Sequence, residues 1–146
     1  MNLTDLRGSF GSICVAVLAL VCGCSGSRVS SRPALTYAVE SNDGAFYVTY
    51  QPLPDPIPLN EPFALVVVVF QDPEHRKAAA DVSLEVDAAM PQHRHGMTLE
   101  PQVEAHGAGS FTVQGMLFHM PGRWELYFDI TQGPVTERAQ LDVKLE

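Results

Sequence analysis

The chain has 146 residues, enough for one domain with a substantial core and too few for two. Its formal net charge of −8, without any cluster of Lys and Arg, argues against binding to nucleic acid. Hydrophobic residues make up 46% of the sequence and charged residues are scattered among them, which is typical of a globular domain and excludes a disordered chain.

The chain begins with a segment that is typical of export. Residues 11–22 are almost entirely apolar and follow a short stretch that contains Arg7. This run is shorter than the roughly 20 apolar residues of a transmembrane helix, and it suits the hydrophobic region of a signal peptide. Residues 21–24, Val-Cys-Gly-Cys, resemble the lipobox of bacterial lipoproteins. The resemblance implies a signal peptide over 1–23 and a lipid anchor on Cys24.

Two alternatives remain for this segment, an ordinary secretory signal and an uncleaved anchor. All three interpretations place the domain outside the cytoplasm. We therefore expect a domain of the cell envelope, held to a membrane by a lipid on Cys24 and facing the periplasm or the cell exterior. Cleavage before Cys24 leaves one cysteine, which excludes an intramolecular disulfide and a thiolate zinc site. Residues 24–44 are rich in Ser, Arg, Asn and Gly and are expected to form a flexible tether.

From Ala45 onward the sequence predicts strands, because β-branched and aromatic residues are frequent and apolar residues alternate with polar ones. The expected strands are 45–51, 62–71, 81–88, 97–103, 110–120, 123–131 and 135–145. The run 62–71 lacks alternation, so we expect a central strand with both faces covered. About seven strands in about 100 residues predict an all-β fold over 45–146, an immunoglobulin-like antiparallel β-sandwich.

The loop from Met90 to Met97, Met-Pro-Gln-His-Arg-His-Gly-Met, contains the most suggestive chemistry in the chain. His93 and His95 are two residues apart, so an extended backbone would project both rings from one face. Met90 and Met97 bracket them with thioether sulfurs. Sulfur together with imidazole suits Cu(I), and imidazole alone also suits Cu(II) or Zn(II).

A second segment, Phe-His-Met-Pro-Gly-Arg-Trp at 118–124, contains His119 and Met120. These two residues would complete a site with the first loop if both loops lie at the same end of the sandwich. The candidate metal ligands, with copper as the expected ion, are Met90, His93, His95, Met97, His119 and Met120.

The order of these motifs resembles the YtkA-like domain family. The resemblance rests on the Met-Pro then His-Gly-Met loop within 84–97, and on the Met-Pro-Gly-x-Trp turn within 109–126. It covers about residues 58–145. It implies a small exported β-sandwich, often a lipoprotein, with an association with copper handling and oxidase assembly. It brings no catalytic residues.

The same side chains also suit a purely structural interpretation. Flexible methionines, including Met116, fill irregular gaps in a core and would plug the open end of the sandwich. His119 shares a face with the apolar residues of its predicted strand and could cap the core. Trp124 is expected to be a buried anchor. His75 and His106, in turns, are expected to be solvated or hydrogen-bonded to backbone.

No nucleophile–base pair, phosphate-binding loop or acid/base pair of carboxylates is apparent, so we do not expect an enzyme. The leading hypothesis is a lipid-anchored, YtkA-like envelope domain that binds copper for metal handling or delivery. The alternative is a structural or protein-interaction module without metal, whose partner is another protein of the envelope. A metal-dependent enzyme is a third hypothesis, and it would need an open coordination site beside a substrate cleft.

Overall fold

The computed structural model describes residues 36–146, so the predicted signal peptide and the anchor residue Cys24 lie outside the described residues. Residues 36–146 form strands joined by turns and one short 3₁₀ turn, named η1. The elements are β1 (Tyr37–Glu40), β2 (Tyr47–Leu53), β3 (Phe63–Phe70), β4 (Ser83–Met90), η1 (Pro91–His93), β5 (His95–Gly96), β6 (Gln102–Gly107), β7 (Ser110–Met116), β8 (Gly122–Gln132) and β9 (Val135–Leu145). In this part of the chain, no helix is long and apolar enough to cross a membrane.

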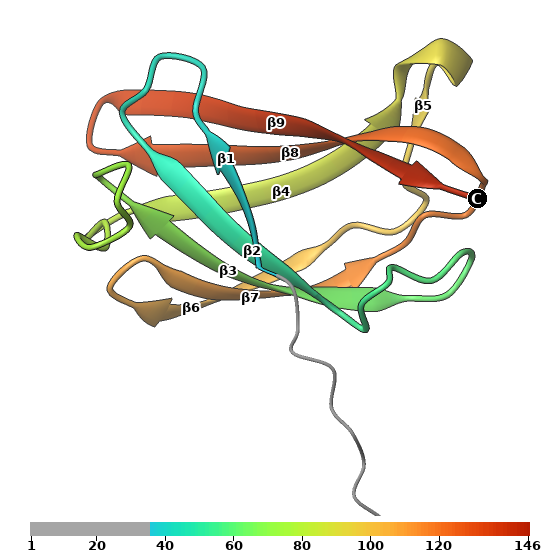
Figure 1. Ribbon diagram of the computed structural model, residues 1–146, viewed down its shortest axis with the longest axis horizontal. Helices are drawn as coiled ribbons and strands as arrows, with labels where there is room; N and C mark the ends of the chain where they lie inside the picture. The colour runs from blue at the N-terminus through green and yellow to red at the C-terminus, as the bar shows by residue number, and fades with distance from the viewer. Residues whose placement is uncertain (1–35) are drawn as a thin grey trace, which may run out of the picture. The chain divides into compact units, whose positions relative to one another are not determined.

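The strands form two antiparallel sheets that face each other (Figure 1). One sheet has the order β1-β2-β3-β7-β6 and the other has the order β5-β4-β8-β9. If β2 is taken as the first strand of an immunoglobulin domain, these orders correspond to its A-B-E-D and C′-C-F-G sheets. The predicted all-β, immunoglobulin-like sandwich is therefore confirmed, with β1 added at one edge.

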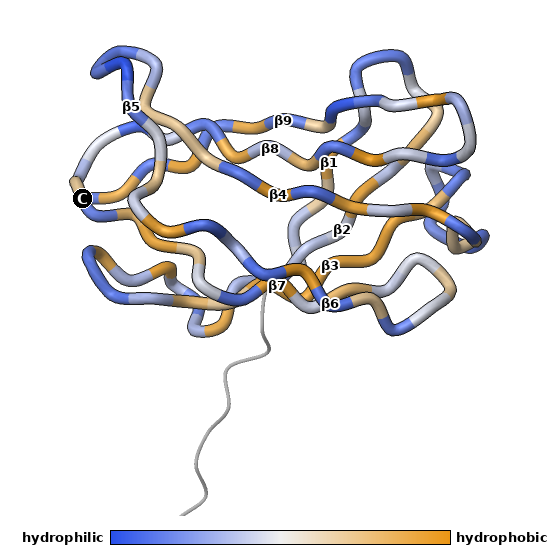
Figure 2. Tube along the Cα trace, turned by 180° about the vertical axis from the view of Figure 1, so that it is seen from behind, coloured by the Kyte–Doolittle hydropathy of each residue, from blue (hydrophilic) through white to orange (hydrophobic). Residues whose placement is uncertain are grey.

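Alternation of apolar and polar residues determines which face of each strand is buried. In β8, Trp124, Leu126, Phe128 and Ile130 are all fully buried, and the residues between them are partly exposed. The alternation of hydropathy along the strands is visible in Figure 2. Strands β4 and β8, which were predicted from this alternation, therefore supply one wall of the core as expected.

Strand β3 is central in its sheet, as predicted, but only one of its faces is fully buried. Its burial alternates along the strand, and the side chain of Val66 is 36% exposed. The expectation that both faces would be covered is wrong because the sandwich has only two layers. The outer face of each sheet meets solvent, and the run of valines there reflects β propensity.

Two predicted strand boundaries are also wrong. Met97 makes one hydrogen bond to β4, residues 98–101 pass from one sheet to the other without pairing, and β6 begins only at Gln102. Pro101 has no N–H to donate to the ladder, which is consistent with a strand that starts after it. Strand β6 then continues to Gly107, through a stretch that was expected to turn.

Strand β7 ends at Met116, although the prediction extended it to Met120. Its pairing with β3 gains one residue between Val113 and Met116, and Gly115 there has a φ of 79°. Without the bulge, residues three apart would point to opposite faces of the sheet. With it, Val113 and Met116 both point into the core. The residues that follow the bulge therefore leave the sheet and form the connection to β8.

The ordered fold begins before Ala45. Strand β1, within the stretch 24–44 predicted as a tether, pairs along its whole length with β2. A bridge between Ser41 and Ala139 then joins the edge of this sheet to β9 of the other sheet. The sandwich is therefore closed along its β1–β9 side, whereas no strand pairing joins β4 to β6 on the other side.

Candidate functional site

Three segments meet at one end of the sandwich: the turn η1 with β5, the connection 117–121 between β7 and β8, and the first residues of β8 (Figure 1). Figure 2 shows the turn before β5 as a hydrophilic tip that projects from the sheet. They belong to the two stretches that the sequence singled out, 90–97 and 118–124, and the structure brings these together.

The β4–β5 hairpin determines where the first two histidines lie. Met90 pairs with His95, and the turn between them contains Arg94 in the left-handed conformation, with a φ of 56°. The backbone around Arg94 is therefore not extended, contrary to the prediction. The rings of His93 and His95 nevertheless stack, with centroids 5.8 Å apart and planes inclined by 20°.

His95 is the link between the two segments. Because it lies directly opposite Met90, its side chain is on the same side of the sheet as that buried methionine. Its ring lies 5.2 Å from the ring of His119 and 6.0 Å from that of Trp124, measured between centroids. His93, His95 and His119 thus form a row of three imidazoles, called here the histidine row.

Trp124 fixes the second segment. Its indole is fully buried and stacks on Phe118 at 4.7 Å, and its N–H donates a hydrogen bond to the carbonyl oxygen of Met120 at 2.9 Å. The ring of His119 stands edge-on to the indole at 5.3 Å. The prediction that Trp124 is a core residue is confirmed, and the indole also orients the backbone that presents His119 and Met120.

The imidazole of His119 has an unsatisfied polar atom. Its Nδ1 is buried and has no hydrogen-bond partner among the described residues. Leaving such an atom without a partner costs about 1–3 kcal/mol, and native proteins seldom do so without a compensating role. His95 is little better placed, since its Nδ1 lies 3.4 Å from the carbonyl oxygen of Gly96, near the limit of a hydrogen bond.

The methionines divide into two groups. Met90 and Met116 are fully buried, and the Met90 methyl group lies so close to Gly122 that a Cβ there would come within 2.9 Å of it. These two side chains fill the end of the core. Met97 is partly buried and packs against the core, whereas Met120 is 36% exposed. Of the three predicted sulfur ligands, Met90, Met97 and Met120, Met120 is therefore the most exposed.

Gln92 is a positioning residue that the sequence analysis missed. Its side-chain amide donates a hydrogen bond to the carbonyl oxygen of Arg123 at 2.6 Å, which ties η1 to the start of β8. The guanidinium of Arg123 pairs with Asp142 at 3.2 Å and with Glu125 at 3.6 Å. The Arg123 side chain is therefore directed toward carboxylates of β8 and β9. No sequence pattern distinguishes Gln92 from an ordinary turn residue.

The histidine row brings three imidazoles close together, but they are not arranged as the ligands of one ion. Two imidazoles that share an ion through metal–nitrogen bonds of about 2 Å have ring centroids about 5 Å apart. The observed separations are 5.8 and 5.2 Å, although the first pair is stacked, so those rings would have to turn to bind one ion. Within residues 36–146 no three His, Cys, Asp or Glu side chains are already grouped as ligands. Met120, next to His119 in the chain, is the nearest exposed thioether in the sequence.

The other two histidines are engaged elsewhere. His106 makes a 2.8 Å hydrogen bond to the Thr112 hydroxyl. His75 is partly buried, and its ring lies 5.1 Å from that of Phe70. His106 is exposed to solvent, in line with the expectation, and it also bonds a side chain, whereas His75 is partly buried against Phe70. Neither residue approaches the histidine row.

No protein-family model matches the chain, and searches of curated proteins and of solved structures give no match.

Proposed function

We propose that the chain is a lipid-anchored, YtkA-like domain of the cell envelope that binds copper through His93, His95, His119 and Met120, and that it handles or delivers the ion without catalytic turnover. The observation that carries the proposal is the convergence of three imidazoles from two loops far apart in the sequence. Membrane attachment through Cys24 and the family assignment rest on the sequence motifs alone.

The donor set favours copper over harder ions. Imidazole and thioether groups suit Cu(I), whereas Ca²⁺ and Mg²⁺ prefer carboxylate oxygens. In the described part of the chain, no carboxylate is hydrogen-bonded to any ring of the histidine row. Met90 and Met97 support the site through packing.

The exposure of the site favours transfer of the ion over chemistry on a substrate. His93 is exposed and Met120 is 36% exposed, so a bound ion would lie near the surface. Hydrolytic or redox catalysis would need a cleft beside the ion. The grooves along β4, along β8–β9 and along β1–β9 are lined by other residues than these histidines.

A second candidate function is a protein-interaction module in which this end is only a packed plug. Met90 and Met116 favour it, because both are fully buried as the structural interpretation expected. In that case His95 and His119 would lie where they do because they pack against Trp124.

Competition titration of Cu(I) against a chromophoric chelator distinguishes the two functions. The soluble form, residues 25–146, is compared with His93→Ala/His95→Ala and with the matched control His75→Ala/His106→Ala. We expect one tightly bound Cu(I), a loss of affinity of about 100-fold or more in the first variant, equivalent to about 3 kcal/mol, and no change in the control. Affinity should also fall with decreasing pH, because a protonated imidazole cannot bind the ion. Equally weak binding by all three proteins would leave the interaction module as the better account.

A further inference from the structure

The side of the sandwich between β4 and β6 contains a free strand edge. Strand β4 pairs with β8 over Ser83–Ala89, but on its other edge β5 pairs only with Ala89 and Met90. Beyond that point the chain leaves β4 and crosses to the other sheet. The opposite side of the sandwich has no such gap, because the Ser41–Ala139 bridge joins the two sheets there.

The backbone groups on this edge can be assigned from one hydrogen bond. The carbonyl oxygen of Ala88 accepts from the N–H of Met97 at 3.1 Å, so the polar groups of Ala88 point away from β8. Alternate residues of a strand point their N–H and C=O groups to the same side. Leu84 and Val86 therefore direct theirs to the free edge, and within residues 36–146 neither has a backbone partner there.

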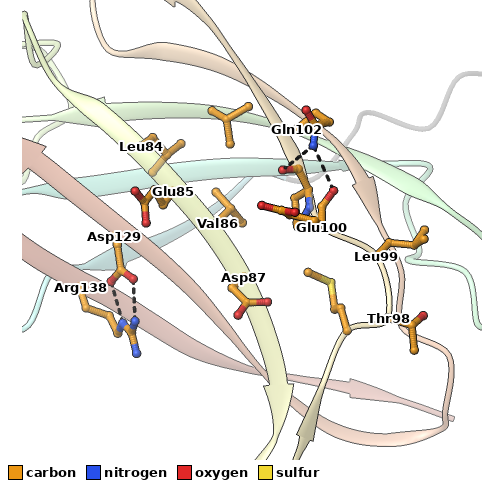
Figure 3. Close-up of a pocket in the computed structure, with 13 residues that line it drawn as sticks. Leu84, Glu85, Val86, Asp87, Thr98, Leu99, Glu100, Gln102, Asp129 and Arg138 are labelled. Carbon is orange, nitrogen blue, oxygen red and sulfur yellow. Dashed lines mark hydrogen bonds and ion pairs between the residues drawn. The ribbon is translucent and has the colours of Figure 1, made fainter.

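A groove of about 750 Å³ runs along the same edge. Figure 3 shows β4 on one side of it and Thr98, Leu99, Glu100 and Gln102 on the other. Leu84 and Val86, 6% and 7% exposed, form its apolar floor, and the side chain of Leu99 at the rim is 43% exposed. The groove thus combines unpaired backbone groups with apolar surface.

The groove is acidic. Glu85 and Asp87 project from the outer face of β4, and Glu100 lies across from them (Figure 3). These three carboxylates form no ion pair in the described part of the chain. Asp129, by contrast, is neutralised by Arg138 through hydrogen bonds of 2.7 and 2.6 Å, which raise the pKa of that guanidinium. A partner strand would therefore meet three carboxylates without an ion-pair partner within residues 36–146, of which Asp87 is also near enough to Arg138 to raise the pKa of its guanidinium.

We propose that the β4 edge, residues 84–87, binds an extended segment of another protein in which basic and apolar residues alternate. The segment would add a strand to the sheet through the N–H and C=O groups of Leu84 and Val86, which is recognition by β-augmentation. Its Lys or Arg side chains lie beside Glu85 and Asp87, and its apolar side chains enter the groove. This binding goes beyond the proposed copper function and uses none of the histidine row.

Electrostatic repulsion makes a second copy of this chain an unfavourable partner for the β4 edge. Pairing two β4 edges would bring Glu85 and Asp87 close to their own equivalents, and like charges on adjacent strands are destabilising. The chain as a whole has a formal net charge of −8, so a basic partner is also favoured at long range.

The test uses residues 25–146 and a fluorescein-labelled peptide in which Lys and Val alternate. The peptide has about eight residues, which is within the usual range of strand lengths. Binding is measured by fluorescence anisotropy, and amide hydrogen exchange is followed residue by residue. We expect the exchange of the Leu84 and Val86 amides to slow by about tenfold or more when the peptide binds. A peptide that alternates Glu and Val should not bind, and N-methylation of the alternate residues facing β4 should abolish binding.

Charge variants provide the matched control. Glu85→Lys/Glu100→Lys should weaken peptide binding by about tenfold or more, whereas Asp43→Lys/Glu61→Lys, with the same change in net charge outside the groove, should weaken it much less. His93→Ala/His95→Ala should bind the peptide like the unmodified protein, whatever its copper affinity. Equal binding of the acidic peptide, equal effects of the two charge variants, or protection of amides elsewhere would overturn the proposal.

Discussion

At one end of the sandwich the β3–β4 loop meets the β8–β9 turn. The polar side chains that join them have hydrogen-bond partners. The carboxylate of Asp72 accepts hydrogen bonds from the backbone N–H groups of Arg76 and Lys77. The side chain of Gln132 accepts a hydrogen bond from Gln71 and donates one to the carbonyl oxygen of Ala80. These side chains, of Gln71, Asp72 and Gln132, hold the loop and the turn in place.

At the other end, the histidine row is arranged differently. His119 has a buried ring nitrogen without a partner among the described residues, and the ring of His95 lies next to those of both His93 and His119. In the described part of the chain, no carboxylate is hydrogen-bonded to any of the three rings. The two ends share strands and core, so the fold does not require this difference. Polar groups that cost free energy without closing a turn are more readily explained by a ligand than by architecture.

The largest expected effect is on stability. Trp124→Ala should lower the free energy of unfolding by about 3–5 kcal/mol, because a fully buried indole and its hydrogen bond are lost. Phe70→Ala, at the other end, removes a partly exposed ring and should cost about 1–2 kcal/mol. Urea denaturation measures both. A similar cost at the two ends would mean that the indole does not anchor the histidine end.

Two glycines with positive φ provide a closer comparison. Gly122→Ala should cost about 2–4 kcal/mol, because its φ is 123° and the new Cβ would lie 2.9 Å from the Met90 methyl group. Gly133→Ala should cost only about 1 kcal/mol, since its φ of 58° is strained for alanine but nothing lies within 4 Å. Thermal unfolding provides the measurement. Equal costs would show that Met90 moves aside freely.

The smallest expected changes in the free energy of unfolding are those of two histidine variants, and the sign for His119→Phe distinguishes the two functions. His119→Phe should raise the free energy of unfolding by about 1 kcal/mol or leave it unchanged, because it removes a buried nitrogen that lacks a partner. The same variant should lose Cu(I) affinity. His106→Phe, which breaks an exposed hydrogen bond to Thr112, should lower stability by about 0.5 kcal/mol. If His119→Phe is clearly destabilising, the imidazole has a structural role, which favours the packed plug.

Regular alternation made most of the fold predictable. The apolar face of β8 and the burial of Trp124 follow from a period of two, which the structure keeps throughout that strand. The end of β7 did not follow, because Gly115 forms a bulge and a single extra residue reverses the face of every later side chain. Gly in a strand permits a bulge, but the sequence does not show whether one forms.

The candidate site was predictable in composition and less so in geometry. The two motifs indicated that His95 and His119 would meet if their loops shared an end, and the structure brings them together. The left-handed Arg94 and the amide of Gln92 that ties η1 to β8 have no signature in the sequence. The free edge of β4 also escaped prediction, because it depends on β5 having only two residues.

Trp124 is the only tryptophan in the chain, and its ring lies against both His95 and His119. Indole emission from this protein therefore originates beside the histidine row and nowhere else. An ion held by those imidazoles would alter the intensity of that emission, so occupancy can be followed without a label. A strand added at the β4 edge should leave the signal nearly unchanged, because the groove contains neither the indole nor the histidines. The protein thus carries an intrinsic fluorophore at the one place where copper is proposed to bind.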